Sequence, residues 1–310
     1  MEGISHVVIE VSDLKRAEEF YREILGFELM DGGAADCGAS VLLGAASGQS
    51  LILSQSAEPR SLPETGVHQA YRVAPRHREA IARNLASRQI DVHTYKEDRP
   101  AEERDNFYFY DFDGNRVQLV VSGADSNASG KVLGIDHAAV ECHDLEWAED
   151  FYVNVLGLAV EHRVGWRTAD YVRGQLWGEG KEDMAPGTRR WDQRYTVMEQ
   201  KRRIPRPNTH FFLRVGDGVL GIYLATQHRQ EPPEEQIVGA PRIGLRVSRS
   251  RLDETLKLLK ERRFLVHGPV EHPVSSPIAA SVYVRDPGAN FLELCVPREG
   301  GARWKIHDRE

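Results

Sequence analysis

The segment Ile4–Phe27, ISHVVIEVSDLKRAEEFYREILGF, occurs in a second version at Ile135–Leu158, IDHAAVECHDLEWAEDFYVNVLGL. The two segments align without a gap at an offset of 131 residues, and 11 of the 24 positions are identical. The shared positions include a histidine, an aspartate, a tyrosine and a glycine: His6 and His137, Asp13 and Asp144, Tyr21 and Tyr152, Gly26 and Gly157. Such a repeat indicates an architecture built from copies of one unit.

Each copy predicts a strand followed by a helix. Apolar and polar residues alternate over residues 4–11, which is the period of a β-strand, so His6 and His137 should point to one defined side of a sheet. Asp13 is a suitable helix N-cap, apolar residues then recur at helical spacing, and Gly26 supplies the stop. Short apolar segments between Gly and Ser turns predict three further strands by about residue 54.

The whole chain divides into four such modules, at residues 1–58, 67–122, 132–228 and 240–299. The polar stretch GADSNASG makes residues 123–131 a flexible linker between two domains, 1–122 and 132–299, and residues 300–310 form a tail. The turn Asp111–Asn115 matches Asp286–Asn290 at an offset of 175 residues, so the second half carries an insert of about 44 residues at roughly 164–208. Its tryptophans and arginines suggest a packed cap, a partner surface or a substrate lid.

Composition excludes several classes of protein. A net charge of -7 and a pI near 6.0 argue against a nucleic-acid-binding surface, which needs clustered Lys and Arg. Three scattered cysteines form neither a CxxC pair nor a disulfide framework, which favours a reducing cytoplasm. The first strand begins at about Ile4, which leaves no room for a signal peptide, and no apolar run approaches membrane-spanning length.

The sequence resembles the vicinal oxygen chelate superfamily, which includes glyoxalase I, bleomycin and fosfomycin resistance proteins and extradiol dioxygenases. The resemblance rests on His6 with DLKRAEEFYREILGF, on its copy from His137, and on the endings YDFDGNRVQLV and VRDPGANFLELCV. It implies an α+β fold of βαβββ modules paired into two glyoxalase/dioxygenase-like domains, with cup-shaped and mostly antiparallel sheets. It also implies metal ligands on the first and last strands of each module.

The resemblance places a candidate metal site in the first domain, on His6, His68 and Gln118. Their spacings of 62 and 50 residues are similar to the His, His, Glu spacing of dioxygenases and fosfomycin thiol transferases. Gln118 departs from that pattern, because an amide oxygen can ligate a metal but brings no charge. Ile52, at the matching place in module 1, cannot ligate. The implied cofactor is Fe(II) or Mn(II), with Zn(II) or Ni(II) as alternatives, or no metal if both sites are degenerate.

The second domain departs from the pattern elsewhere. His137 and Glu293 occupy ligand positions, but Arg242 stands at the place of the expected second histidine, and Tyr223 at the end of module 3. Arginine pairs with a carboxylate far more readily than it ligates a cation. This set is therefore either a former metal site closed by a salt bridge or an anion-binding pocket. His210 is a possible substitute ligand, although it aligns with a middle strand.

The pairing of the modules is open at this stage. Some family members pair module 1 with module 4 and module 2 with module 3. That arrangement would group the candidates differently, as His68, Gln118 and His137 with Tyr223, and His6 with Arg242 and Glu293. Without the family pattern, a histidine on a strand is more often a hydrogen-bonded core or surface residue than a metal ligand.

Three functions remain possible. Four modules in a chain of this size most resemble the ring-cleaving extradiol dioxygenases, which bind a catechol and dioxygen at a ferrous site. A second possibility is a Lewis-acid metalloenzyme of the glyoxalase or thiol-transferase type. A third is a non-catalytic protein that binds a small molecule, as the bleomycin-binding members do. In each case the expected partner is a small molecule, with neither nucleic acid nor membrane, and a homodimer is one alternative for the assembly.

Overall fold

The computed structural model of the chain describes residues 1–30, 38–60, 66–94, 105–122, 131–164, 210–225, 232–274 and 276–298. Nearly all of the expected linker, the insert at 164–208 and the tail at 300–310 lie outside these ranges. Within the described residues, no helix combines the length and the apolar content needed to cross a membrane.

Each of the four modules is a strand, a helix and then three strands. Module 1 holds β1 (Gly3–Val11), α1 (Leu14–Phe20) continued by the wider turn η1 (Tyr21–Leu25), β2 (Glu28–Leu29), β3 (Ser40–Gly44) and β4 (Ser50–Gln55). Module 2 holds β5 (His68–Val73), α2 (Pro75–Ser87), β6 (His93–Thr94), β7 (Phe107–Tyr110) and β8 (Arg116–Val121). The order of elements confirms the βαβββ unit in both modules.

The second half repeats this order. Module 3 holds β9 (Val132–Cys142), α3 (Leu145–Glu149) continued by η3 (Asp150–Val155), β10 (Ala159–Val164), β11 (His210–Val215) and β12 (Gly218–Leu224). Module 4 holds β13 (Arg242–Arg246), α6 (Arg249–Glu261), β14 (Val266–Glu271), β15 (Ile278–Arg285) and β16 (Phe291–Pro297).

The helix signals of the repeat act as expected. Asp13 accepts a hydrogen bond from the backbone N–H of Arg16, and Asp144 accepts one from Trp147, so both aspartates are N-caps. Gly26 and Gly157 end the two helical segments with φ of 80° and 72°, in the left-handed region that only glycine adopts without strain. The four identical residues therefore fix the length of the first helix in both copies.

Two eight-stranded sheets result, and each draws one module from each half of the chain. The first sheet has the order β14-β15-β16-β13-β1-β4-β3-β2, and the second has β10-β11-β12-β9-β5-β8-β7-β6. Most neighbouring strands are antiparallel, which confirms the expected α+β fold with mixed, mainly antiparallel sheets. Modules 1 and 4 join through β1 and β13, and modules 2 and 3 through β5 and β9. The chain thus pairs module 1 with module 4 and module 2 with module 3.

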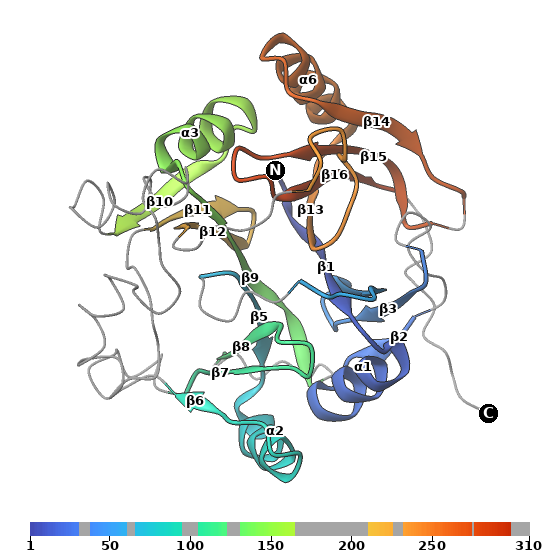
Figure 1. The fold of residues 1–310 in the computed structure, drawn as a ribbon, viewed down its shortest axis with the longest axis vertical. Helices are drawn as coiled ribbons and strands as arrows, with labels where there is room; N and C mark the ends of the chain where they lie inside the picture. Colours follow the sequence, from blue (N-terminus) through green and yellow to red (C-terminus); the bar gives the residue numbers. More distant parts are fainter. Residues whose placement is uncertain are drawn as a thin grey trace.

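Successive modules contact each other behind the sheets. In Figure 1, β1 and β9 cross the centre of the molecule, while the helices lie near its periphery. Helix α2 contacts η1, and α6 contacts η3. One continuous apolar core contains side chains from all four modules, including Phe20, Leu85, Phe151 and Leu259. Each sheet therefore has one face against this shared core and one face free to form a cup.

Two equivalent turns tie the sheets together. Asn115 donates its amide N–H to the backbone oxygen of Glu10 at 2.9 Å, and Tyr21 donates its hydroxyl to Asp111 at 2.8 Å. In the second half, Asn290 donates to the Glu141 oxygen at 2.9 Å, and Tyr152 donates to Asp286 at 2.7 Å. Each turn belongs to one sheet and holds a strand and a helix of the other. The repeated Asp, Asn and Tyr are thus structural ties, since hydrogen bonds to a buried carboxylate are strong.

Candidate functional site

We call the free face of the first sheet the first cup and the free face of the second sheet the second cup. The module pairing divides the candidate residues between them. His6 lies in the first sheet with Arg242 and Glu293, while His68 and Gln118 lie in the second sheet with His137. The first-domain set of His6, His68 and Gln118 is therefore not brought together. The physical reason is that β1 of module 1 hydrogen-bonds to β13 of module 4, while β5 of module 2 hydrogen-bonds to β9 of module 3.

The two cups are built on equivalent rows of residues that face each other across the strands. The row of the first sheet runs Ser50, His6, Gly244, Glu293, Tyr283, His267. The row of the second sheet runs Val219, His137, Ala70, Gln118, Tyr108, His93. Residues directly opposite in neighbouring strands point to the same face of a sheet. The rows therefore show that His6 corresponds to His137, and Glu293 to Gln118.

The first cup is closed by ionic contacts among its own side chains. His6 Nε2 lies 3.2 Å from Glu293 Oε2, and Arg242 Nε lies 3.1 Å from the same oxygen. Ser281 donates its hydroxyl to Glu293 Oε1 at 2.7 Å. All four side chains are buried. The salt bridge between Arg242 and Glu293, one of the sequence-based alternatives, is thus present in the structure.

The electrostatics of this cluster oppose metal binding. Burial by itself raises the pKa of Glu293, but the His6 ring, Arg242 and the Ser281 hydroxyl outweigh it and lower the pKa to about 2. Glu293 is therefore ionised and can only accept, so His6 must present an N–H from Nε2 rather than a lone pair. A guanidinium also fills the position of a second ligand. The residues of the first cup do not fit a metal cation.

The second cup brings two imidazoles together instead. His68 Nε2 and His137 Nε2 lie 2.9 Å apart. His68 Nδ1 is 2.6 Å from the backbone oxygen of Gly66, and His137 Nδ1 is 2.6 Å from Asp136 Oδ1. Burial raises the pKa of Asp136, but the hydrogen bond from His137 and the nearby Arg72 more than reverse this, so the net effect is a lowered pKa. Both acceptors therefore require a proton on Nδ1 of the histidine that they contact.

This tautomer assignment leaves a lone pair on each Nε2, and the two lone pairs converge. Two neutral imidazoles cannot approach to 2.9 Å in this way unless a proton or a cation lies between them. Two nitrogen ligands at right angles, each about 2.0–2.1 Å from one metal ion, are separated by about 2.9 Å. A carboxylate or carbonyl behind a ligand histidine is the usual support of metal sites. The His68 and His137 pair therefore fits a divalent metal.

Gln118 supplies an oxygen on the same row. It stands across β8 and β5 from His137, with only Ala70 between them, and it is buried. The small Ala70 side chain leaves space between the amide and the imidazoles. Among the described residues, no group of three or more His, Cys, Asp and Glu side chains is placed to hold a metal. The donor set of this cup is therefore two nitrogens and a neutral amide oxygen.

Tyr223 lies two residues beyond the position that matches Ile52 in the structure. Val8 faces Ile52 in the first sheet, and the equivalent Ala139 faces Gly221 in the second, so Gly221 takes the place of Ile52. The ring of Tyr223 lies over Gly221. A Cβ added at Gly221 would be 3.1 Å from Tyr223 Cε2. The same ring packs on Gly66, which supplies the carbonyl to His68. Tyr223 thus forms part of the wall that positions His68.

His210 belongs to this wall as well. It faces Tyr223 across β11 and β12, its ring stacks on the tyrosine with centroids 4.6 Å apart, and it is buried. The ring of His68 is 6.1 Å from that of Tyr223. The order of the wall is thus His68, Tyr223, His210. The possible substitute ligand therefore lies on the far side of Tyr223 from the imidazole pair.

Asp136 and Gly66 are residues of the candidate site that the sequence did not indicate. Asp136 precedes His137, and adjacent residues of a regular strand point to opposite faces. Here β9 is irregular, since Ala70 faces His137 while Tyr71 faces Ile135, so Asp136 is an extra residue opposite β5. Such a bulge re-aims a side chain and leaves no sequence signal of its own. The Gly66 contact depends on loop geometry, which the strand pattern could not show.

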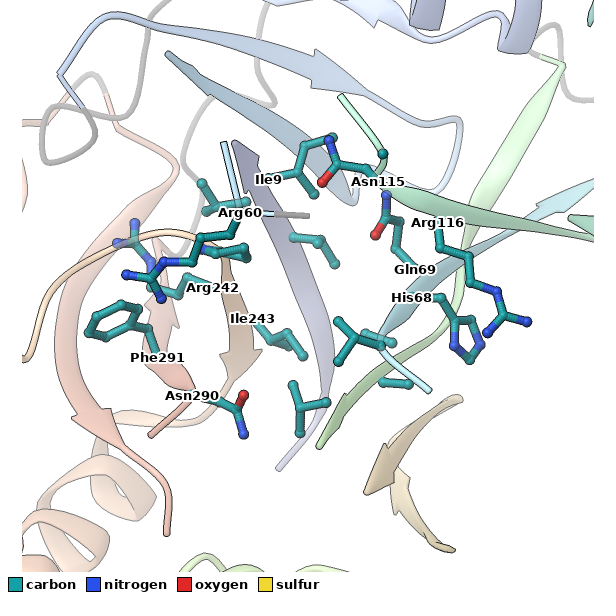
Figure 2. A pocket seen from close by; sticks show the side chains of 18 of the residues that line it. Ile9, Arg60, His68, Gln69, Asn115, Arg116, Arg242, Ile243, Asn290 and Phe291 are labelled. Carbon is teal, nitrogen blue, oxygen red and sulfur yellow. The ribbon is translucent and has the colours of Figure 1, made fainter. Parts of the chain in front are cut away.

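A hollow of about 780 Å³, the part open to solvent included, lies between the sheets. Its wall contains equivalent segments of the opening strands, residues 7–9 and 138–140, and it reaches His68 on one side and Arg242 on the other. Figure 2 shows Arg60, Arg242 and Phe291 on one side of it and His68 and Arg116 on the other. The hollow thus separates the two cups and touches both.

Comparison with known proteins agrees with this architecture. Residues 3–119 match the model of the Glyoxalase/Bleomycin resistance protein/Dioxygenase superfamily, and the internal repeat extends the pattern to the second half. The first half of the chain thus carries the pattern of this superfamily. No curated protein matches the chain.

Two solved structures have a fold similar to that of most of the chain. A candidate dioxygenase from Bacillus subtilis has a TM-score of 0.63 at 15% identity, covering 95% of this chain and 85% of its own. Glyoxalase I from Zea mays has a TM-score of 0.56 at 15% identity, covering 96% of this chain and 92% of its own. At this identity the likeness establishes the fold alone and leaves the reaction to be argued from the site.

Proposed function

We propose that this chain is a metal-dependent enzyme whose metal site lies in the second cup. His68 and His137 are the nitrogen ligands, Gln118 is an oxygen donor, and the substrate is a small molecule with vicinal oxygens. The observation that supports the proposal is the convergence of the two Nε2 atoms at 2.9 Å while both Nδ1 atoms are held by oxygen acceptors.

The residues around the site have separate tasks in this proposal. Gly66 and Asp136 fix the tautomers and the ring orientations of the ligands. Ala70 is a small residue between Gln118 and His137, and Tyr223, whose ring lies over Gly221, forms one wall of the cup. A bound divalent metal supplies Lewis acidity that polarises the substrate oxygens, and iron in particular supplies one-electron chemistry toward dioxygen.

Ring-cleaving dioxygenation is the first candidate reaction. Two imidazoles and one oxygen donor on one face leave neighbouring positions for a catechol and for dioxygen, as in non-haem iron sites. Lewis-acid chemistry without oxygen, of the glyoxalase or thiol-transfer kind, is the second candidate. It is favoured by Gln118, because a neutral amide does not reduce the charge of the bound cation as a carboxylate would.

Activity of the reconstituted chain tests this proposal. The full chain is loaded with Fe(II) under argon, mixed with oxygenated catechols, and followed by an oxygen electrode and by the absorbance of ring-opened products. We expect oxygen uptake in the wild type and in His6→Ala, and at least a hundredfold loss in His68→Ala. Turnover of 2-oxoaldehyde thiol adducts with Zn(II) or Ni(II), and no oxygen uptake, would support the second candidate. Ligand binding that survives chelation, without turnover, would contradict an enzyme.

A further inference from the structure

The turn between β3 and β4 of the first sheet contacts the irregular part of β9 in the second sheet. The backbone N–H of Ser47 donates to the backbone oxygen of Leu133 at 2.9 Å. Gln49, which precedes β4 and is only 3% exposed, accepts a hydrogen bond on Oε1 from the backbone N–H of Ile135 at 2.8 Å. Its Nε2 donates to the backbone oxygen of Ile4 in β1 at 2.9 Å. One buried amide thus joins the opening strands of both sheets.

The two backbone groups that bind Gln49 lie beside equivalent bulges. Ile4 and Ile135 correspond to each other at the offset of 131 residues. Ser5 follows Ile4 and is an extra residue opposite β13. Asp136 follows Ile135 in the same way and is the extra residue opposite β5. Because a bulge interrupts the hydrogen-bond ladder locally, contacts from outside the ladder help to orient its extra residue.

The residues around the contact are fitted to this amide. A Cβ added at Gly134 would lie 2.6 Å from Gln49 Oε1 and 2.8 Å from Ser47 Oγ, so the close approach requires glycine. Ser47 also donates its hydroxyl to Gln49 Oε1 at 2.8 Å. In module 3 the equivalent of Gln49 is Gly218, since β4 and β12 pair with β1 and β9 in matching register. The bridging side chain therefore comes from the first sheet.

The contact leads directly to a proposed metal ligand. Ile135 precedes Asp136, whose Oδ1 lies 2.6 Å from Nδ1 of His137. Adjacent residues of a regular strand point to opposite faces, so Asp136 reaches His137 only through the bulge. This hydrogen bond keeps the proton on Nδ1 and leaves the Nε2 lone pair for a cation. Such outer partners change the metal affinity of a site by about 10- to 100-fold.

From these contacts, and resting on the proposed function, we infer that Gln49 is a positioning residue of the metal site in the second cup. It acts through the backbone of Ile135, which holds the bulge, and then through Asp136, which holds the Nδ1 proton of His137. The metal affinity of the second cup therefore depends on a side chain of the first sheet.

A double-mutant cycle on Co(II) affinity tests the inference. The full chain and its variants are titrated with Co(II), and the visible absorption gives the dissociation constant. Asp136→Ala should weaken Co(II) binding by about 10- to 100-fold, and Gln49→Met should reproduce most of this loss. The double variant should bind about as weakly as Asp136→Ala alone, because residues that act through one another are not additive.

Three further variants separate positioning from general stability. Gln49→Glu keeps an acceptor for the Ile135 N–H and should restore most of the affinity lost in Gln49→Met. Gly134→Ala displaces the amide with a Cβ and should weaken Co(II) binding while every polar side chain remains. Asn106→Leu removes another buried amide, which accepts from the backbone N–H of Val121 at 2.8 Å. This matched control should lower stability in urea and leave the Co(II) affinity unchanged.

The outcomes separate this inference from the function on which it rests. Additive losses in the double variant, or a loss in Asn106→Leu as large as that in Gln49→Met, would overturn the positioning role and leave the metal site standing. Unchanged Co(II) affinity in Gln49→Met and Gly134→Ala would overturn it in the same way. Failure of the wild type to bind Co(II), or binding that survives His137→Ala, would overturn the proposed function and the inference with it. Gly134→Ala also keeps the test independent of whether Gln49→Met folds.

Discussion

The two cups share one architecture and differ in how their polar groups are satisfied. In the first, His6, Arg242 and Glu293 neutralise one another within 3.2 Å. In the second, His137 occupies the place of His6, but it meets another imidazole, and the amide of Gln118 replaces the carboxylate. The difference shows that a histidine at a superfamily ligand position has no fixed role. Its role depends on whether the neighbouring strands supply a partner for Nε2.

Three substitutions along the equivalent positions account for the difference. Gly244 in the first cup gives the His6 ring room to lie toward Glu293, while Ala70 occupies the corresponding place in the second. Arg242 corresponds to His68, and Glu293 corresponds to Gln118. The first cup thereby becomes a polar contact between modules 1 and 4, and the second keeps converging nitrogen donors. We expect the first to contribute to stability and the second to contribute to ligand chemistry.

The largest expected difference in stability is between substitutions at Glu293 in the first cup and at Gln118, its equivalent in the second cup. Glu293→Gln leaves the buried Arg242 without its carboxylate, and loss of one partner of a buried ion pair costs about 3–5 kcal/mol. Gln118→Ala, at the equivalent position, should cost only about 1 kcal/mol. Urea unfolding followed by circular dichroism measures both changes. Equal losses in the two variants would contradict the assignment of the ion pair to one cup alone.

The acid dependence of stability gives the next largest effect. The pKa of Glu293 is about 2 in the folded chain, against an ordinary value of 4.5. A lowered folded-state pKa means that the contribution is complete above pH 4.5 and is lost as the pH falls toward 2. The difference in pKa corresponds to about 3 kcal/mol. Denaturant unfolding at several pH values should show this loss in the wild type, and Glu293→Gln should flatten it; an unchanged acid profile in that variant would argue against the lowered pKa.

A smaller loss of stability is expected at Gly244, which lies between His6 and Glu293 in the row of the first sheet. A Cβ at Gly244 would lie 2.2 Å from Cε1 of His6, so Gly244→Ala should push the ring away from Glu293 and cost about 1–3 kcal/mol. The reciprocal change, Ala70→Gly, should cost about 0.5–1 kcal/mol, the ordinary penalty of a glycine in a strand. Thermal unfolding of the pair measures both, and a stable Gly244→Ala chain would mean that the close approach is not required.

Much of the fold could be predicted from the sequence, because the repeat fixed the modules and the caps at Asp13, Gly26, Asp144 and Gly157. The candidate positions His6, His68, Gln118, His137, Arg242 and Glu293 were also found from the family pattern. Their grouping could not be found in the same way, since both module pairings bury the same apolar faces. Only the hydrogen bonds of β1 to β13 and of β5 to β9 decide it.

Other parts of the site left no signal in the sequence. Asp136 reaches His137 because of a bulge in β9, and Tyr223 was displaced from its predicted place by the register of β12 on β9. An offset of two residues moves a side chain along the cup without changing the face to which it points, because side chains of a strand alternate with a period of two.

Metal content per chain tests the central claim most directly. The wild type, His137→Ala and His6→Ala are purified without chelator, incubated with Fe(II), Mn(II), Zn(II) or Ni(II), and analysed for bound metal. We expect about one metal ion per chain in the wild type and in His6→Ala, and none in His137→Ala. Loss of metal in His6→Ala with retention in His137→Ala would place the site in the first cup and contradict the account.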